Sequence, residues 1–244
     1  MLDPRTLTAL ALASGGAAIV IATRQGTRSG ALAGLAVASL VILGLGPGAL
    51  LPLAIFVLGA GALTRWGRAR KEATGSAEAD QGRRGVRHVL AKLGLPALLG
   101  ICAILGAETH SLALAYVAAI AAAFADTAAT ETGPLVGGRV VRLQGFRLER
   151  ASHGSLGGLS MAGVGAAALG ALLIGWSAVI TGLLHGGAQA AVAAAAGFAA
   201  TMAESFIAGS SIGIRLGHFG RNMLVSIVAV ALASAAAAWG WGRA

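Results

Sequence analysis

Long apolar runs separated by short polar stretches make up most of this chain. A helix needs about 20 apolar residues to cross the hydrocarbon core of a bilayer, and eight runs approach that length. The predicted spans are 6–23, 29–46, 48–66, 89–107, 111–132, 157–184, 187–213 and 222–241. We therefore expect an all-α integral membrane protein, one transmembrane domain over residues 1–244, with two longer loops at about 67–88 and 133–156.

The composition agrees with a protein whose surface is covered by lipid. Hydrophobic residues make up 57% of the chain and charged residues 11%, whereas soluble domains carry about 25% charged residues. The net charge of +9 is compatible with nucleic-acid binding, but aromatic residues are only 5% and the basic residues lie between apolar runs. That distribution is typical of membrane orientation signals. We expect the membrane as a partner and no nucleic acid.

The basic residues also predict the orientation. If the eight spans alternate in direction, every lysine and arginine except Arg5 and Arg243 falls on one side. Loops rich in lysine and arginine stay in the cytoplasm. We therefore predict a multi-pass protein of the cell membrane, with both termini away from the cytoplasm. The two long loops, and any active site near them, should face the cytoplasm.

An acidic residue inside the fifth predicted span is the strongest functional signal. Asp126 lies about eight residues before Gly133-Pro134, where we expect the helix to break, which places it roughly 12 Å deep. A carboxylate at such a depth costs about 2.5–3.5 kcal/mol on insertion scales and usually faces a bundle interior or a wet cavity. The alternative is a structural Asp126 satisfied by a neighbouring threonine or arginine.

Two further acids are candidates for the same site. Asp126 and Glu131 are five residues apart and diverge by about 140° around the helix, so one can hold a metal while the other orients a partner. Thr130 shares the face of Asp126, and Thr127 that of Glu131. Glu204 lies at a similar depth in the seventh span, and two carboxylates at one depth suit a shared Mg²⁺. A protonated Glu204, or an ion pair with an arginine, is the alternative.

The loop 67–88 mixes acids with bases and surrounds Arg83-Arg84 with glycines. Guanidinium groups beside flexible backbone suit phosphate oxygens, which they bind bidentately. The alternative is a basic anchor attracted to anionic lipid, which explains Arg65 and Arg68 well but not the interleaved acids or the glycines around Arg83-Arg84. Both interpretations stay open.

A second polar motif runs from His153 to Ser160, at the predicted start of the sixth span. Glycines and hydroxyls at a helix N-terminus offer free N–H groups and a positive dipole end to an anion. The motif is not a P-loop, because no Gly-Lys-Ser/Thr follows. A plain loop with a capping serine is the alternative.

Several motifs occur in one order between about residues 55 and 226. They are Lys71-Glu72 with Gly75, Gly82-Arg83-Arg84-Gly85, Val89-Leu90-Ala91, Ala125-Asp126-Thr127, Thr130-Glu131-Thr132-Gly133, Gly154–Ser160 with Gly163, Glu204-Ser205, and Asn222. In this order they resemble the phytyl-phosphate kinase family of the vitamin E pathway, with its uncharacterised relatives of the transmembrane protein 19 type. A more distant likeness runs to polyprenol kinases and membrane cytidylyltransferases.

Three positions depart from the family pattern. Lys92 stands where the family usually has asparagine, Ser155 replaces a threonine, and Glu204 replaces an aspartate. Ser155 keeps the hydroxyl and Glu204 keeps the carboxylate. Lys92 is the substitution that bears most on the choice of substrate and nucleotide.

The resemblance implies phosphoryl transfer from a nucleoside triphosphate to a lipid-embedded isoprenoid monophosphate of the phytyl or geranylgeranyl type. The distant likeness implies CTP as the donor, and Mg²⁺ is the expected cofactor. The implied catalytic residues are Asp126, Glu131, Lys71 and Arg84, and the implied metal ligands are Asp126, Glu131 and Glu204. The implied nucleotide- or phosphate-binding residues are Arg83, Gly85, Lys92, Thr127, Thr130, Gly154, Ser155, Gly157, Gly158, Ser160 and Asn222.

Two other functions fit part of the pattern. A transporter also carries intramembrane carboxylates, but the two halves of this chain show no convincing repeat of the kind that many transporters contain. A cytidylyltransferase that forms a CDP-lipid would release pyrophosphate from CTP, whereas a kinase would release CDP.

Overall fold

The computed structural model describes residues 2–73, 84–144 and 147–241. Within this part of the chain, eight helices are long and apolar enough to cross a membrane, which confirms the expected all-α membrane fold. They are α1 (Pro4–Ala22), α2 (Arg28–Leu45), α3 (Leu50–Arg65), α5 (Val86–Ile104), α6 (Thr109–Val136), α7 (Met161–Ile180), α8 (Gly187–Ala208) and α9 (Ser211–Ala238). A 3₁₀ turn, η1 (Pro47–Ala49), extends the third span.

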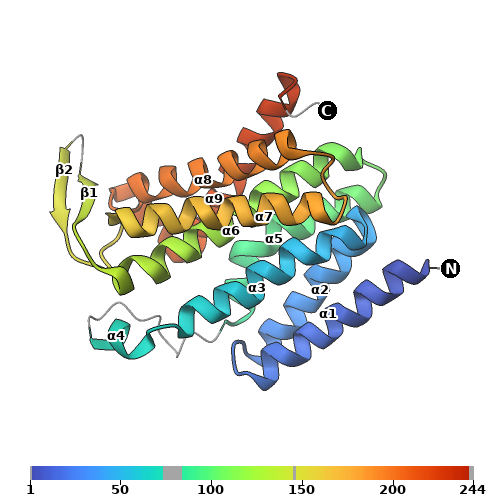
Figure 1. The fold of residues 1–244 in the computed structure, drawn as a ribbon, viewed down its shortest axis with the longest axis horizontal. Helices are drawn as coiled ribbons and strands as arrows, with labels where there is room; N and C mark the ends of the chain where they lie inside the picture. Colours follow the sequence, from blue (N-terminus) through green and yellow to red (C-terminus); the bar gives the residue numbers. More distant parts are fainter. Residues whose placement is uncertain (1, 74–83, 145–146, 242–244) are drawn as a thin grey trace.

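Helix α6 lies at the centre of the bundle and is buried along most of its length. Helices α3, α5, α7, α8 and α9 pack against it, and α1 lies at the edge, mainly on α2 (Figure 1). Alanine dominates α6, and small residues let membrane helices approach closely. A Cβ atom at Gly197 of α8 would lie 2.7 Å from the Ala122 backbone nitrogen, so α8 needs a glycine there.

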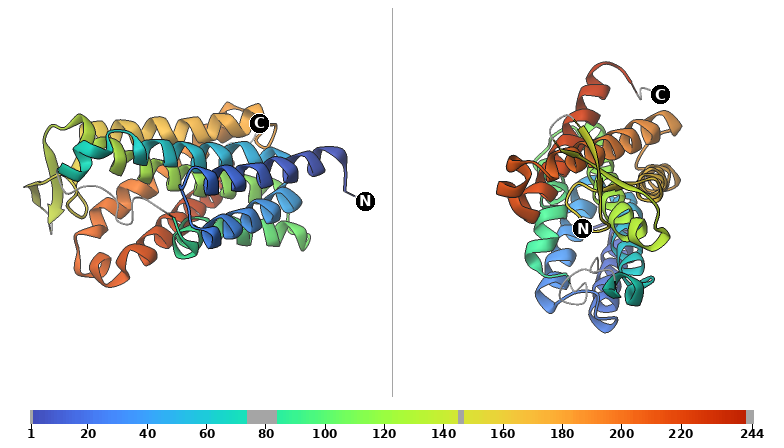
Figure 2. Two further views of the ribbon diagram at one scale, coloured as in Figure 1. Left: turned by 90° about the horizontal axis from the view of Figure 1, so that it is seen from below. Right: turned by 90° about the vertical axis from the view of Figure 1, so that its left-hand side faces the viewer.

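The polar segments gather at one end of the bundle. Short helix α4 (Arg68–Ala73) lies there, with a three-stranded antiparallel sheet of β1 (Val140–Gln144), β2 (Arg147–Ala151) and β3 (Leu159–Ser160) in the order β2-β1-β3. The chain begins at the opposite end (Figure 2). The described parts of the two long loops therefore share one end of the molecule, as the alternating spans predict. That this end faces the cytoplasm stays a prediction.

Helix α6 does not break at Gly133-Pro134, so that prediction was wrong. The helix continues to Val136 and ends at Gly137, whose φ of +81° suits glycine. Pro134 removes one backbone donor near the end of the helix, and the last turn still closes through a 3.1 Å bond from the Gly137 N–H to the Gly133 carbonyl. A proline inside a helix removes one i→i−4 bond and can kink the helix without ending it.

The boundaries of the last three spans also differ from prediction. Helix α7 begins at Met161 rather than 157, because Ser160 adopts an extended conformation and caps it. Helix α8 ends at Ala208 rather than 213. Helix α9 begins at Ser211 rather than 222 and is kinked at Gly217, where φ is +62°. Hydropathy missed this first segment of α9 because it carries two arginines.

Candidate functional site

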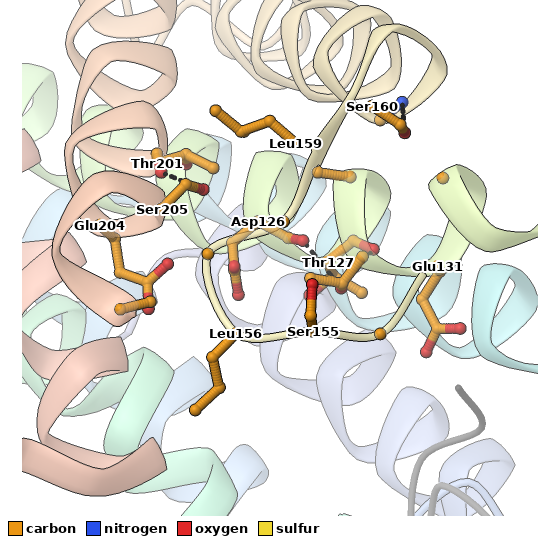
Figure 3. A pocket seen from close by; sticks show the side chains of 18 of the residues that line it. Asp126, Thr127, Glu131, Ser155, Leu156, Leu159, Ser160, Thr201, Glu204 and Ser205 are labelled. Atoms are coloured by element: carbon orange, nitrogen blue, oxygen red, sulfur yellow. Dashed lines mark hydrogen bonds between the residues drawn. The ribbon is translucent and has the colours of Figure 1, made fainter. Parts of the chain in front are cut away.

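A polar pocket of about 280 Å³ opens at the end of the bundle that carries the sheet. Helices α5, α6, α7, α8 and α9 and the loop before α7 supply its walls (Figure 3). Twelve of the residues singled out from the sequence line it: Lys92, Asp126, Thr127, Thr130, Glu131, Gly154, Ser155, Gly157, Gly158, Ser160, Glu204 and Asn222. The fifth and seventh spans and the glycine-rich loop therefore meet in one cavity.

Asp126 forms an ion pair with Lys92 of helix α5. The Lys92 Nζ lies 2.7 Å from Oδ2 of Asp126. The same ammonium donates to the Thr127 hydroxyl at 2.8 Å and to the Ala123 carbonyl at 3.4 Å. The Lys92 side chain is 6% exposed and that of Asp126 is 20% exposed. The lysine is thus enclosed by its acceptors, while the carboxylate keeps an accessible part within the pocket.

Glu204 pairs with a basic residue as well. Its Oε1 lies 3.0 Å from Nε of Arg221 on helix α9, and both side chains are largely buried. Arg221 also donates from Nη1 to the Gly213 carbonyl at 3.0 Å, across the kink in its own helix. The structure therefore has the arginine ion pair that the sequence offered as an alternative for Glu204. This pair closes the α8–α9 side of the pocket.

Glu131 belongs to a third buried pair, with Lys71 of α4. The Lys71 Nζ lies 2.5 Å from Oε2 of Glu131 and also donates to the Leu63 and Thr64 carbonyls at 2.8 and 3.1 Å. The Thr64 hydroxyl donates to Oε1 of Glu131 at 2.7 Å. Lys71 is 1% exposed, and three acceptors match its three donors. This network ties α4 and the end of α3 to α6.

Arg84 and Gly85 lie beside this network and outside the lining of the pocket. The Arg84 backbone pairs with the turn between α1 and α2, accepting from Thr27 and donating to Gln25, each at 3.1 Å. Its Nη2 donates to the Thr64 hydroxyl at 3.2 Å. Gly85 precedes α5 as its extended N-cap residue. Arg83 lies outside the described residues.

The loop before α7 is shaped by its glycines. Gly154 and Gly157 have φ values of +81° and +71°, a region that favours glycine. A Cβ atom at Gly157 would lie 2.5 Å from the Ser205 carbonyl oxygen, so the loop lies directly against the α8 backbone. Ser160 caps α7 by accepting from the Gly163 N–H at 3.1 Å. The loop thus brings the N-terminus of α7 to the pocket, where an anion is favoured.

The acids do not form a metal cage made of protein alone. In the part of the chain that the structure describes, no group of three or more His, Cys, Asp or Glu side chains is placed to hold a metal ion. Glu131 and Glu204 lie on opposite sides of Asp126 (Figure 3). Mg²⁺ commonly uses one or two carboxylates, with waters and substrate phosphates as its remaining ligands. Asp126, with a partly exposed carboxylate in the pocket, can supply one such carboxylate ligand.

Sequence reasoning missed several polar partners. The sequence does not single out Thr64 as a partner of Glu131, because threonines are common in apolar spans, where the hydroxyl usually bonds to its own helix. Arg221 was assigned to a loop, although its position just before an apolar run at the depth of Glu204 is a usable signal. His218 and Thr201 also line the pocket. The partners of the acids therefore emerge only from the packing of the helices.

Comparison with known proteins places the chain in a family. No curated protein and no solved structure matches it. The model of the integral membrane protein family DUF92 matches residues 11–212, which is most of the chain and includes the pocket acids Asp126, Glu131 and Glu204. The chain therefore belongs to the DUF92 family of integral membrane proteins.

Proposed function

We propose that this protein is a prenyl-phosphate kinase. It transfers the terminal phosphoryl group of a nucleoside triphosphate to an isoprenoid monophosphate of the phytyl or geranylgeranyl type, giving the diphosphate. The observation that carries the proposal is the Asp126–Lys92 pair in a polar pocket beside the glycine-rich loop and the α7 N-terminus. The resemblance of the motifs to phytyl-phosphate kinases supports it independently, and CTP is the donor that the more distant likeness favours.

The reaction needs positioning more than covalent chemistry. An oxygen of the lipid monophosphate attacks the terminal phosphorus of the nucleotide, and the bond from that phosphorus to the bridging oxygen breaks. The nucleoside diphosphate leaves with the bridging oxygen. The attacking phosphate is already ionised at neutral pH, so the site needs no strong general base. A polar pocket that opens at one end of the bundle gives a soluble nucleotide access to a lipid-borne acceptor.

Each part of the pocket has a role in this reaction. The N–H groups around Gly157, Gly158 and the α7 N-terminus hold nucleotide phosphates. Lys92 supplies a positive charge beside the transferred group and holds Asp126 in place. Lys71 and Glu131 position the α3–α4 corner against α6. Asp126 would hold Mg²⁺, and the ion would offset negative charge in the transition state.

The assay uses purified protein in detergent with geranylgeranyl monophosphate, Mg²⁺ and either labelled CTP or labelled ATP. Formation of geranylgeranyl diphosphate together with the nucleoside diphosphate supports the kinase. Pyrophosphate release with a CDP-lipid product would instead show a cytidylyltransferase. If phytyl, geranylgeranyl and shorter prenyl phosphates all give no nucleotide-dependent product, the kinase proposal is contradicted. The membrane transporter is then the remaining alternative. Reconstituted vesicles loaded with labelled prenyl phosphate then test that remaining alternative.

A further inference from the structure

A second cavity, of about 610 Å³, runs between α1, α2, α3 and α5. Aliphatic and aromatic side chains such as Leu12, Leu35 and Phe56 form its walls over most of its length. It extends from the turn between α1 and α2 to η1, near the other end of the bundle. Its volume lies within the range of about 300–1,000 Å³ typical of ligand sites. We refer to it as the α1–α5 groove.

The polar groups of the α1–α5 groove gather at one end. Gln25, Arg84, His88 and Lys92 line it there, on the side of the bundle that carries the polar pocket. Among the described residues, Nε2 of His88 is buried without a hydrogen-bond partner, and an imidazole N–H there can donate to an anion. Backbone bonds to the α1–α2 turn hold Arg84 at this end. An apolar groove that ends in cationic and hydrogen-bonding groups complements a lipid with one anionic headgroup.

The α1–α5 groove and the polar pocket share one wall. Lys92 lines both cavities, and its ammonium reaches Asp126 on the pocket side. A phosphate at the polar end of the groove and a nucleotide in the pocket would therefore both lie against Lys92. A groove that only holds bulk lipid would not need to share Lys92 with the polar pocket.

We infer that the α1–α5 groove binds the hydrocarbon chain of the acceptor, a single-chain prenyl monophosphate, with its phosphate between Arg84, His88 and Lys92. This inference rests on the proposed kinase function and adds where the acceptor lies. The chain enters from the bilayer between helices at the edge of the bundle, where α1 packs mainly on α2. The nucleotide approaches from the opposite side of Lys92, so the two substrates meet without exchanging places.

Photo-crosslinking tests this site without requiring turnover. The probe is geranylgeranyl monophosphate with a diazirine at the end of its chain, added to purified protein and mapped by mass spectrometry. Labelling is expected on the groove-facing parts of α1, α2 and α3. Unlabelled geranylgeranyl monophosphate should compete at least ten-fold better than geranylgeraniol or phosphatidic acid. Labelling confined to the outer faces of α7 and α8, or equal competition by all three lipids, overturns the inference.

A groove-filling variant gives the second test. A Cβ atom at Gly34 of α2 meets nothing within 4 Å, and Gly34 lines the groove, so Gly34→Leu fills it without backbone strain. Gly165 of α7 has equal space but lies outside both cavities, so Gly165→Leu is the matched control. Gly34→Leu should reduce probe labelling at least ten-fold, and Gly165→Leu should leave it unchanged. Equal labelling of both variants contradicts the groove assignment.

Turnover separates this inference from the proposed function. The ratio of kcat/KM for geranylgeranyl over dimethylallyl monophosphate should fall at least ten-fold in Gly34→Leu and stay constant in Gly165→Leu. Specific labelling of the groove without phosphoryl transfer by the parent protein would overturn the kinase and keep the lipid site. Phosphoryl transfer by a parent protein whose groove is not labelled would overturn the site and keep the kinase.

Discussion

Three acids at one end of the bundle each face a basic partner, and their surroundings give them different roles. Asp126 is partly exposed within the pocket, whereas the side chain of Glu131 is 6% exposed and bonded on both oxygens. Glu204 lies between these extremes, with its side chain 14% exposed. A buried ion pair with complete hydrogen bonding mainly holds helices in register. An accessible carboxylate beside a lysine can exchange that partner for a bound ligand.

The Lys71–Glu131 pair should contribute to stability. Glu131→Gln leaves the Lys71 ammonium buried without a counter-charge, and breaking a buried pair in this way costs about 3–5 kcal/mol. We expect a clearly lower thermal midpoint in detergent. Glu149→Gln, on the exposed strand β2, is the matched control and should leave the midpoint unchanged.

The double variant Lys71→Met, Glu131→Leu separates charge from packing. Replacing both partners of a buried pair by apolar residues is often neutral or stabilising, so part of the lost stability should return. An unchanged midpoint in Glu131→Gln alone would show that the pair does not hold the α3–α4 corner in place.

Among the structural elements, the loop that leads into α7 depends on one glycine. Gly157→Ala forces alanine to a φ of +71° and places its Cβ 2.5 Å from the Ser205 carbonyl. The left-handed conformation alone costs about 1–2 kcal/mol. We expect the loop to move away from α8, which should raise the KM for the nucleotide several-fold.

Gly106→Ala supplies the control for that experiment. Gly106 has a φ of +92° and no atom within 4 Å of its ideal Cβ position, in the turn between α5 and α6. It carries the same backbone strain at the opposite end of the molecule. Gly106→Ala should lower stability and leave the nucleotide KM unchanged. Equal KM values in both variants would mean that the loop does not bind the nucleotide.

Hydropathy predicted each membrane-spanning helix that the structure describes, but not every helix boundary. The first segment of α9 was not predicted, because Arg215 and Arg221 lower its hydropathy. In the structure, Arg221 is buried against Glu204. Those site residues were predictable that are polar and lie within apolar segments of the sequence, such as Asp126. The pairing of Asp126 with Lys92, and the α1–α5 groove, depend on how distant helices pack. No local sequence pattern predicts either the ion pair or the groove.

At the scale of the whole molecule, the charge distribution predicts which end faces the cytoplasm. In a Cys102→Ala background, Glu149→Cys on β2 and Ala107→Cys before α6 place single thiols at exposed positions on opposite ends of the bundle. A membrane-impermeant maleimide should label Ala107→Cys in intact cells and label Glu149→Cys only after lysis. Labelling of Glu149→Cys in intact cells would invert the topology and exclude a cytoplasmic nucleotide site.

The central claim is that the pocket around Asp126 transfers a phosphoryl group to a prenyl phosphate. The most direct test compares the parent protein, Asp126→Asn and the control Glu149→Gln. Turnover of geranylgeranyl monophosphate is measured at saturating Mg²⁺ and nucleotide, with thermal unfolding followed in the same detergent. Asp126→Asn keeps the shape of the side chain and removes its charge. It should stay folded and lose activity by orders of magnitude, while Glu149→Gln behaves like the parent. A folded Asp126→Asn protein that turns over at the parent rate would contradict the account.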